Sequence, residues 1–231
     1  TTVAAASAIP PMNRTVTERL NPQVEALLVR LMAERRDMVI DGQPVFAVND
    51  KFLPGKIAVG MAGLILETPR SDPAFSTYLA GFRDLANLTL EDTNTEWGVY
   101  YYLLALHRLQ QAGLLDQAVE PATLARLRHQ LDWRSFVREG DLTLINLPNN
   151  YYGVAYSVAQ LRSLLGWESA DAADALLDKA LAHYATYSDY GFADETDGQG
   201  RFDRYSVLLI GEIAQRFIDV GREPPARVKA W

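Results

Sequence analysis

The sequence of residues 94–101 is repeated 55 residues later, and this internal repeat restricts the possible folds more than any other feature. Residues 94–101 read Asn-Thr-Glu-Trp-Gly-Val-Tyr-Tyr, and residues 149–156 read Asn-Asn-Tyr-Tyr-Gly-Val-Ala-Tyr, without a gap between the two copies. The apolar positions that follow stay in register, for example Leu103 and Val158. Repeats of this length are typical of helical hairpins stacked into an array.

Two further copies extend the repeat. Residues 203–207 match residues 150–154, and residues 53–56 match residues 96–99 more faintly. In the stronger copies a polar loop ends in Asn or Asp, an aromatic residue follows, then Gly or Ser, and then an apolar helix. Every second helix therefore begins in the same way.

Helical periodicity and start and stop signals predict about eight or nine helices and only short β-pieces. The helices that begin at a repeat are expected over residues 54–67, 94–112, 149–165 and 202–220. More polar helices are expected between them, over residues 73–87, 121–138 and 169–189. The predicted class is all-α, with helical hairpin repeats that form an (α/α) toroid or an incomplete part of one. Residues 1–14 are expected to be a flexible arm, and residues 15–231 the toroid domain, the N-terminal part of a longer toroid.

In such a double layer the repeat helices line the inside and point the same way, so their N-termini gather at one end. Free N–H groups and positive dipole ends then converge there. Aromatic rings beside amides and carboxylates suit a sugar, whose apolar face stacks on a ring while its hydroxyls need polar partners. The side chains expected at this end are Asn94, Glu96, Trp97, Asn149, Asn150, Tyr151, Tyr152, Asp203, Arg204 and Tyr205.

Each group also has a purely structural alternative. Helix capping is the commonest role of Asn or Asp at positions such as Asn94, Asn149 and Asp203. A pair of adjacent asparagines, Asn149 and Asn150, exceeds what one cap requires. The loop that contains Asp197 is either a flexible part of the cleft or only a turn.

Composition excludes several kinds of site. The chain has no cysteine, so disulfides, thiolate nucleophiles and cysteine-bound zinc are ruled out. The three histidines, His107, His129 and His183, have no metal-binding spacing, and we expect neither a metal nor another cofactor. A net charge of −7 argues against a nucleic-acid partner, and no apolar run is long enough to span a bilayer.

The N-terminal residues indicate an exported protein. Residues 1–8 are small, and Pro10 and Pro11 follow, as is typical just after a signal-peptide cleavage site. We therefore expect a periplasmic or secreted location. The alternative is that residue 1 marks an arbitrary boundary of the sequence and not a cleavage site.

Residues 148–156 and 190–205 resemble bacterial (α/α)-toroid glycan-degrading enzymes, in particular heparinase II/III-like polysaccharide lyases and their toroid relatives. The resemblance covers residues 90–220 and implies an oligo- or polysaccharide substrate. It implies that Asn149 or Asn150 contacts a substrate carboxylate or hydroxyl. It also implies that Tyr151 or Tyr152 stacks on the sugar or transfers a proton.

Two departures separate this chain from those enzymes. Toroid lyases commonly use a catalytic histidine, and no histidine here lies at the start of a repeat helix. A complete toroid also needs more helices than are expected here, so the missing half of the toroid is a possible partner.

Three functions remain open. The first is a glycan-cleaving enzyme, either a hydrolase or a lyase. A hydrolase would pair two carboxylates, Asp203 with Glu96 or with Asp197. In a lyase a tyrosine would abstract a proton while asparagine and Arg204 neutralise a uronate carboxylate. The second is a sugar-binding or scaffold protein without catalysis, and the third is a toroid that acts on a prenyl or peptide substrate.

For the first function the residues divide into two sets. The predicted catalytic residues are Tyr152, Asp203 and Tyr205. The predicted substrate-binding residues are Asn94, Glu96, Trp97, Asn149, Asn150, Tyr151, Asp197 and Arg204.

Overall fold

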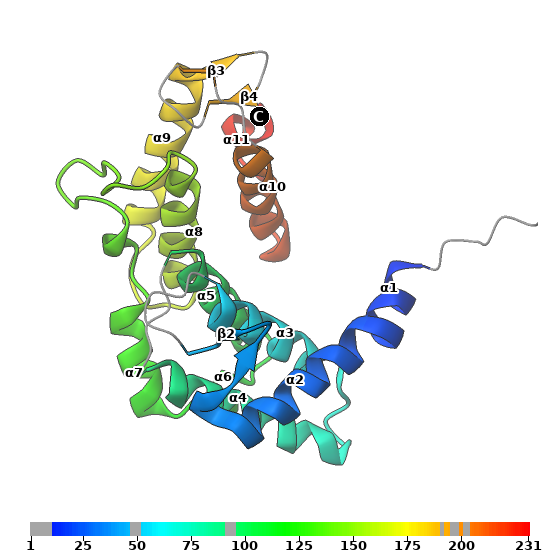
Figure 1. Ribbon diagram of the computed structural model, residues 1–231. Coiled ribbons are helices and arrows are strands. Elements are labelled where there is room, and N and C mark those ends of the chain that lie inside the picture. Colours follow the sequence, from blue (N-terminus) through cyan, green and yellow to red (C-terminus); the bar gives the residue numbers. More distant parts are fainter. Residues whose placement is uncertain (1–10, 47–51, 91–95, 190–191, 195–198, 201–203) are drawn as a thin grey trace, which may run out of the picture.

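The computed structural model describes residues 11–46, 52–90, 96–189, 192–194, 199–200 and 204–231. Helices dominate these residues, and the described strands form two short antiparallel hairpins (Figure 1). Strand β1 (Val39–Ile40) pairs with β2 (Gln43–Pro44), and β3 (Ser188–Asp189) pairs with β4 (Phe192–Ala193). The predicted all-α class is confirmed.

Four helices begin at the four copies of the sequence repeat. They are α3 (Leu53–Glu67), α5 (Trp97–Gln111), α8 (Tyr151–Leu164) and α10 (Arg204–Asp219). We call them the inner helices. Their observed bounds lie within a few residues of the predicted ones.

The inner helices run parallel, because both of their ends meet. At the N-terminal ends, α3 and α5 approach so closely that a Cβ added at Gly55 would lie 2.5 Å from the carbonyl oxygen of Gly98. At the C-terminal ends, the side chain of Gln110 donates to the carbonyl of Leu165 at 3.3 Å. Gln111 likewise donates to the carbonyl of Asp219 on α10 at 3.5 Å. A common direction therefore brings the starts of these helices to one end of the protein.

A second set of helices covers the first. It comprises α4 (Pro73–Thr89), α7 (Pro121–Gln130) and α9 (Asp171–Thr186), with the short α6 (Leu115–Ala118) between α5 and α7. Proline at the first position begins both α4 and α7, where its missing N–H costs nothing. The polar outer helices predicted from the sequence are thus present, although α7 is shorter than expected.

The chain begins with a helical segment that extends from the body (Figure 1). It contains α1 (Met12–Thr15), the π-helix η1 (Val16–Leu20), α2 (Asn21–Glu34) and the 3-10 helix η2 (Arg35–Asp37). Residues 1–10 of the predicted arm lie outside the described residues. Helix α1 begins directly after Pro11, whose extended backbone precedes its first turn, so residues 12–14 of the predicted arm are helical. The last helix is the single turn α11 (Ala226–Lys229).

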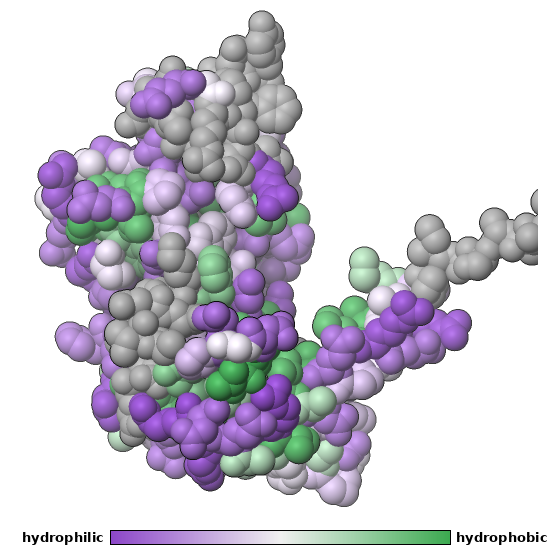
Figure 2. All heavy atoms as spheres, in the orientation of Figure 1, coloured by the Kyte–Doolittle hydropathy of each residue, from purple (hydrophilic) through white to green (hydrophobic). Residues whose placement is uncertain are grey.

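Hydrophobic residues gather where this segment meets the body (Figure 2). Met12 is 78% exposed and Leu20 is 51% exposed, whereas Leu28 and Leu31 of α2 are buried. The buried pair packs against the body, and a Cβ at Gly81 of α4 would lie 2.3 Å from Leu28 Cδ1. The segment is therefore anchored through the second half of α2.

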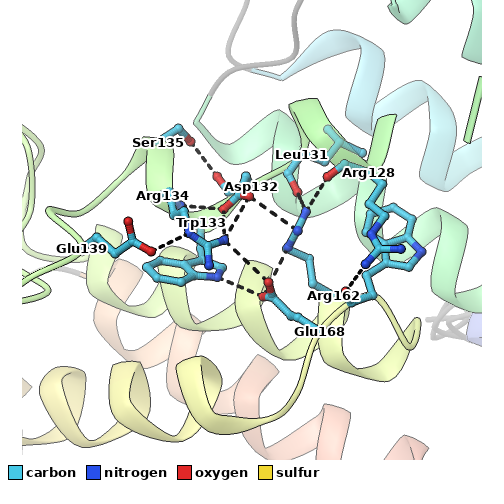
Figure 3. A network of polar contacts seen from close by, with 10 residues as sticks. Arg128, Leu131, Asp132, Trp133, Arg134, Ser135, Glu139, Arg162 and Glu168 are labelled. Atoms are coloured by element: carbon cyan, nitrogen blue, oxygen red, sulfur yellow. Dashed lines mark hydrogen bonds and ion pairs between the residues drawn. The ribbon is translucent and has the colours of Figure 1, made fainter. Parts of the chain in front are cut away.

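A polar network explains why α7 stops at Gln130 instead of continuing to residue 138 as predicted (Figure 3). The guanidinium of Arg162, buried on α8, donates from Nη1 to the carbonyls of Arg128 at 2.7 Å and Leu131 at 2.6 Å. These carbonyls belong to the last turn of α7, so Arg162 satisfies helix-end acceptors that otherwise need a cap. Asp132 then accepts from the backbone N–H of Arg134 at 2.9 Å and starts the 3-10 helix η3 (Trp133–Ser135).

The same network neutralises the buried guanidinium. Arg162 lies 3.5 Å from an oxygen of Asp132 and 3.3 Å from an oxygen of Glu168, and Trp133 Nε1 donates to Glu168 at 2.9 Å. Arg134 stacks over the ring of Trp133 at 4.3 Å. These contacts fix the segment that leads from α7 to the start of α8.

His107 on α5 makes folding stability depend on pH. It is only 6% exposed, and neither ring nitrogen has a hydrogen-bond partner among the residues that the structure describes. Burial lowers the pKa of His107 most, Asp219 and the nearby side chain of Gln110 raise it, and Arg108 and Arg216 lower it. Because the unfolded chain takes up a proton more readily than the native one, the free energy of unfolding should fall as the pH drops below about 6.5.

This prediction can be measured by urea denaturation between about pH 8 and pH 5. Substitution of His107 by leucine should flatten the dependence in that range. His129 is exposed on α7, and a His129→Gln control should keep the wild-type slope. An equal slope in wild type and His107→Leu would contradict the assignment.

Candidate functional site

Four aromatic rings and one carboxylate meet where α5, α8 and α10 begin. Measured from the ring centroid of Trp97, Tyr151 lies at 6.1 Å, Tyr205 at 6.2 Å and Tyr101 at 6.2 Å. Together with Glu96 we call these residues the aromatic corner. Such separations are those of edge-to-face and tilted aromatic pairs.

The repeat explains why these rings meet. Trp97 and Tyr151 are the first residues of α5 and α8, and Tyr205 is the second residue of α10. Tyr101 lies one turn after Trp97 on the same side of α5, as residues four apart on a helix do. The predicted convergence of the inner-helix starts is therefore observed for α5, α8 and α10.

Glu96 has an unusual backbone at the entrance to α5. Its φ is 49° and its ψ is −120°, a conformation that favours glycine, and its carboxylate accepts a hydrogen bond from the hydroxyl of Tyr151. Such a backbone costs about 1–3 kcal/mol and is held only where surrounding structure fixes it. The conformation directs the carboxylate of α5 to the first residue of α8.

Tyr151 is a proton donor in this pair. Burial raises the pKa of its phenol well above the usual range, and the carboxylate of Glu96 raises it further. Tyr151 therefore stays protonated at neutral pH and donates a hydrogen bond to Glu96. A tyrosine held in this way is unsuited to act as a general base.

The corner is buried on one side and open on the other. Trp97 is 7% exposed and Tyr151 is 5% exposed, whereas Tyr205 is 38% exposed. The exposed guanidinium of Arg204 lies 5.4 Å from the Tyr205 ring centroid, at the distance of a cation–π contact. An aromatic surface with an arginine beside it thus faces solvent at the start of α10.

The buried guanidinium of Arg216 holds Tyr100, which packs against Trp97 of the corner. Arg216 on α10 donates to Gln160 Oε1 at 2.7 Å, to the Tyr100 hydroxyl at 2.9 Å and to Ser157 Oγ at 2.6 Å. Tyr100 in turn packs against Trp97, with ring centroids 6.4 Å apart. Arg216 therefore joins α5, α8 and α10 inside the core and is linked to the corner through Tyr100.

Glu212 also faces this layer. Burial raises the pKa values of Tyr100 and Tyr101, Arg216 lowers that of Tyr100, and Glu212 raises both. Its Oε2 is shielded from solvent and has no hydrogen-bond partner within the described part of the chain. Glu212 thus places a second carboxylate close to the corner, on α10.

Asn150, just before Tyr151, is a buried amide that does not cap its helix. It is 7% exposed, has helical dihedral angles, and forms no side-chain cap hydrogen bond. Its Oδ1 is shielded from solvent and unpartnered within the described residues. An unsatisfied buried acceptor costs about 1–3 kcal/mol, so its retention needs a reason other than helix capping.

Other predicted site residues lie elsewhere or are not described. Tyr152 points to the outer layer, where its ring centroid lies 5.1 Å from that of His183 on α9. Asn149 is half-buried, and its carbonyl accepts from the N–H of Tyr152 at 3.1 Å. Asn94, Asp197 and Asp203 lie outside the described residues. The corner therefore contains Glu96, Trp97, Tyr151 and Tyr205 of the predicted set, with Arg204 beside Tyr205.

The sequence analysis did not identify Arg216 as a buried residue of the site, although its position relative to the apolar residues of α10 indicates burial. The buried residues of α10 include Leu209, Ile213 and Phe217 at helical spacing, and Arg216 lies on that buried stripe. A single charge on an apolar stripe indicates a buried, hydrogen-bonded group.

Two pockets lie away from the corner, among the residues that the structure describes. One, of about 430 Å³, is lined by polar groups such as Asn21, Glu67 and Asp72. The other, of about 220 Å³, is apolar, lies between α2 and α3, and has Lys56 among its lining residues. Within the described ranges no cluster of His, Asp and Glu could hold a metal ion. No helix there is long and apolar enough to cross a membrane.

Comparison with known proteins adds no family. No protein-family model matches the chain, and no curated protein or solved structure matches it significantly. Fold and site together define an all-α protein of parallel inner helices with an aromatic corner at their N-terminal ends.

Proposed function

We propose that this chain is part of an (α/α) toroid that binds and cleaves a glycan at the aromatic corner. The observation that carries the proposal is the meeting of the exposed Tyr205, the buried Trp97 and the Glu96–Tyr151 pair at the starts of three parallel helices. A glycan substrate is consistent with a periplasmic or secreted location, which remains part of the proposal.

Sugar recognition needs both an aromatic ring for stacking and polar groups for the hydroxyls. A pyranose ring has an apolar face that stacks on an aromatic side chain, and its hydroxyls need donors and acceptors at its edge. Tyr205 supplies the exposed ring. Glu96 supplies an acceptor, and Arg204 supplies donors.

The chemistry of the corner favours hydrolysis over elimination. Glu96 is a carboxylate next to a protonated phenol, and glycoside hydrolysis needs a pair of carboxyl groups. Asp203, outside the described residues, is the proposed second carboxyl group, and the alternative pair, Asp203 with Asp197, lies wholly outside them. Elimination would need a tyrosine base, and burial makes Tyr151 a poor one. Tyr152 and Tyr205 remain the tyrosines proposed for that alternative.

Glycan binding without cleavage is the second candidate. The position of Tyr152 favours it, because that proposed catalytic ring packs on His183 of α9. A site of stacking rings with no reacting pair would still bind sugar.

Substitution of Glu96 by glutamine should abolish cleavage and largely preserve binding. The amide cannot exchange a proton, and loss of an acid–base group lowers turnover by about 10²–10⁴-fold. The full chain is incubated with a panel of neutral and uronic-acid polysaccharides, and reducing ends and the absorbance of unsaturated products are followed. New reducing ends without that absorbance indicate hydrolysis.

A matched control is Glu120→Gln, an exposed carboxylate at the start of α7 that forms no side-chain cap bond. It should retain wild-type turnover. Equal turnover in wild type and Glu96→Gln would remove Glu96 from the reaction. Binding by the wild type with no product from any polysaccharide would leave the sugar-binding alternative.

A further inference from the structure

The pocket of about 220 Å³ between α2 and α3 is apolar except for one lysine. Its lining includes Val24 and Leu27 of α2 and Ile57 of α3, and Lys56 is the one polar side chain among the described residues that line it. Val24 and Leu27 are half-buried, so apolar surface remains open to solvent there. A concave apolar surface with a single placed polar group has the composition of a small-molecule site.

Gly60 of α3 keeps this pocket open. A Cβ at Gly60 would lie 3.5 Å from both Cγ atoms of Val24, which is an ordinary contact distance, so a side chain could be accommodated. Gly55 differs, because a Cβ there would collide with the backbone of Gly98. Glycine weakens the interior of a helix, and at Gly60 no close approach of another backbone requires it. The missing side chain therefore leaves space between α3 and α2.

Lys56 brings a positive charge to this apolar surface. It is exposed, forms no ion pair within the described part of the chain, and has its Nζ 4.7 Å from the ring centroid of Phe52. A lysine in such a place lays its aliphatic stem on the apolar wall and keeps the ammonium in water. The ammonium is a compact point charge that suits a monoanion, whereas planar guanidinium groups favour phosphate. No arginine is among the described residues that line the pocket.

We propose that this pocket binds a single-chain aliphatic carboxylate, with the tail between α2 and α3 and the carboxylate on Lys56. An apolar cavity of about 150 Å³ holds benzene, so a pocket of this size suits a tail of roughly six to ten carbon atoms. The charge at the rim is complementary to the carboxylate, and the apolar walls are complementary to the tail. The site shares no lining residue with the aromatic corner and does not depend on the proposed function.

Methyl NMR of the full chain tests this site with octanoate as the probe. The chain contains four methionines, and carbon-13 labelling of their methyl groups gives signals that single Met→Leu substitutions assign. Octanoate should shift the signal of Met61, which lines the pocket, and leave that of the 78% exposed Met12 in place. Butyrate, with the same carboxylate and a shorter tail, should bind about tenfold or more weakly, because each buried methylene adds affinity. An unmoved Met61 signal with octanoate would overturn the inference.

Two substitutions separate the contribution of the tail from that of the charge. Gly60→Leu should fill the pocket and abolish binding of both octanoate and octan-1-ol. Its matched control is Gly63→Leu, at a position where a Cβ meets nothing within 4 Å in the described ranges, and this variant should bind both ligands. Lys56→Met keeps an unbranched stem and removes the charge, so it should weaken octanoate binding about threefold and leave octan-1-ol binding unchanged.

The lysine variant keeps the test decisive even if Gly60→Leu fails to fold, because Lys56 is exposed. Lys179→Met on α9 is its matched control and should bind octanoate as the wild type does. Equal octanoate affinity in the wild type and in Lys56→Met would overturn the assignment of the carboxylate to Lys56.

A second copy of the chain is the other occupant that could cover this apolar surface. Sedimentation velocity at the concentrations used for NMR distinguishes it from a small ligand. A monomer whose Met61 signal moves only with octanoate supports the inference. A ligand-free dimer that Gly60→Leu dissociates would overturn it. Neither result bears on the glycan site, since the pocket contains no residue of the aromatic corner.

Discussion

Replacement of Gly55 by alanine is expected to destabilise the protein by about 3 kcal/mol, as overpacking at a close contact does. A Cβ at this position would lie 2.5 Å from the carbonyl oxygen of Gly98 and 2.9 Å from its Cα. Both are backbone atoms, so no side-chain rotation relieves the contact. Helices α3 and α5 would have to separate.

The control for this substitution lies on the same helix. A Cβ at Gly63 would meet nothing within 4 Å in the described part of the protein. Gly63→Ala should therefore stabilise the protein by about 0.5–1 kcal/mol, since alanine has the higher helix propensity. Chemical denaturation of both variants measures the difference. Equal stabilities would contradict the close parallel packing of α3 and α5.

Loss of Arg216 should have a comparable or larger effect, roughly 3–5 kcal/mol for Arg216→Ala. The substitution would leave Gln160, Ser157 and Tyr100 without a buried donor and would open a cavity between α5, α8 and α10. Because Tyr100 packs on Trp97, the aromatic corner should also loosen.

Two further variants isolate the cause. Arg216→Lys keeps the charge but cannot reach three acceptors with a planar fork, so an intermediate loss of stability is expected. Arg14 on α1 forms an exposed ion pair with Glu18, and Arg14→Ala should change the free energy of unfolding little. Denaturation midpoints and the near-ultraviolet signal of the tryptophans report stability and the packing of the corner. Wild-type stability of Arg216→Ala would show that the buried network contributes little.

The repeat made much of the fold predictable. The sequence of residues 94–101 recurs at 149–156, and the structure begins helices at Trp97 and Tyr151 accordingly. Even the faint copy at Leu53 marks the start of an inner helix, with Gly55 against Gly98. Equivalent residues of neighbouring repeats meet, because parallel neighbours in an array are related by a nearly constant displacement.

Long-range partners were not predictable from local pattern. The end of α7 depends on Arg162, which reaches its last carbonyls from α8. The helix propensities of residues 131–138 do not reveal this contact with Arg162. Likewise, Tyr151 and Tyr152 look equivalent in sequence, yet one bonds Glu96 and the other packs on His183. Neighbouring helical residues differ by about 100° in direction, so only the packed structure decides which one reaches the corner.

Fluorine NMR of protein labelled with 5-fluorotryptophan tests the glycan-binding corner most directly. The chain has four tryptophans, each of which can be assigned by a single Trp→Phe substitution. Titration with the best-binding oligosaccharide should shift the resonance of Trp97 and leave those of Trp133 and Trp167, which lie in and beside the Arg162 network, in place. Shifts confined to Trp133, Trp167 or Trp231, or no shift with any glycan, would contradict a sugar site at the starts of α5, α8 and α10.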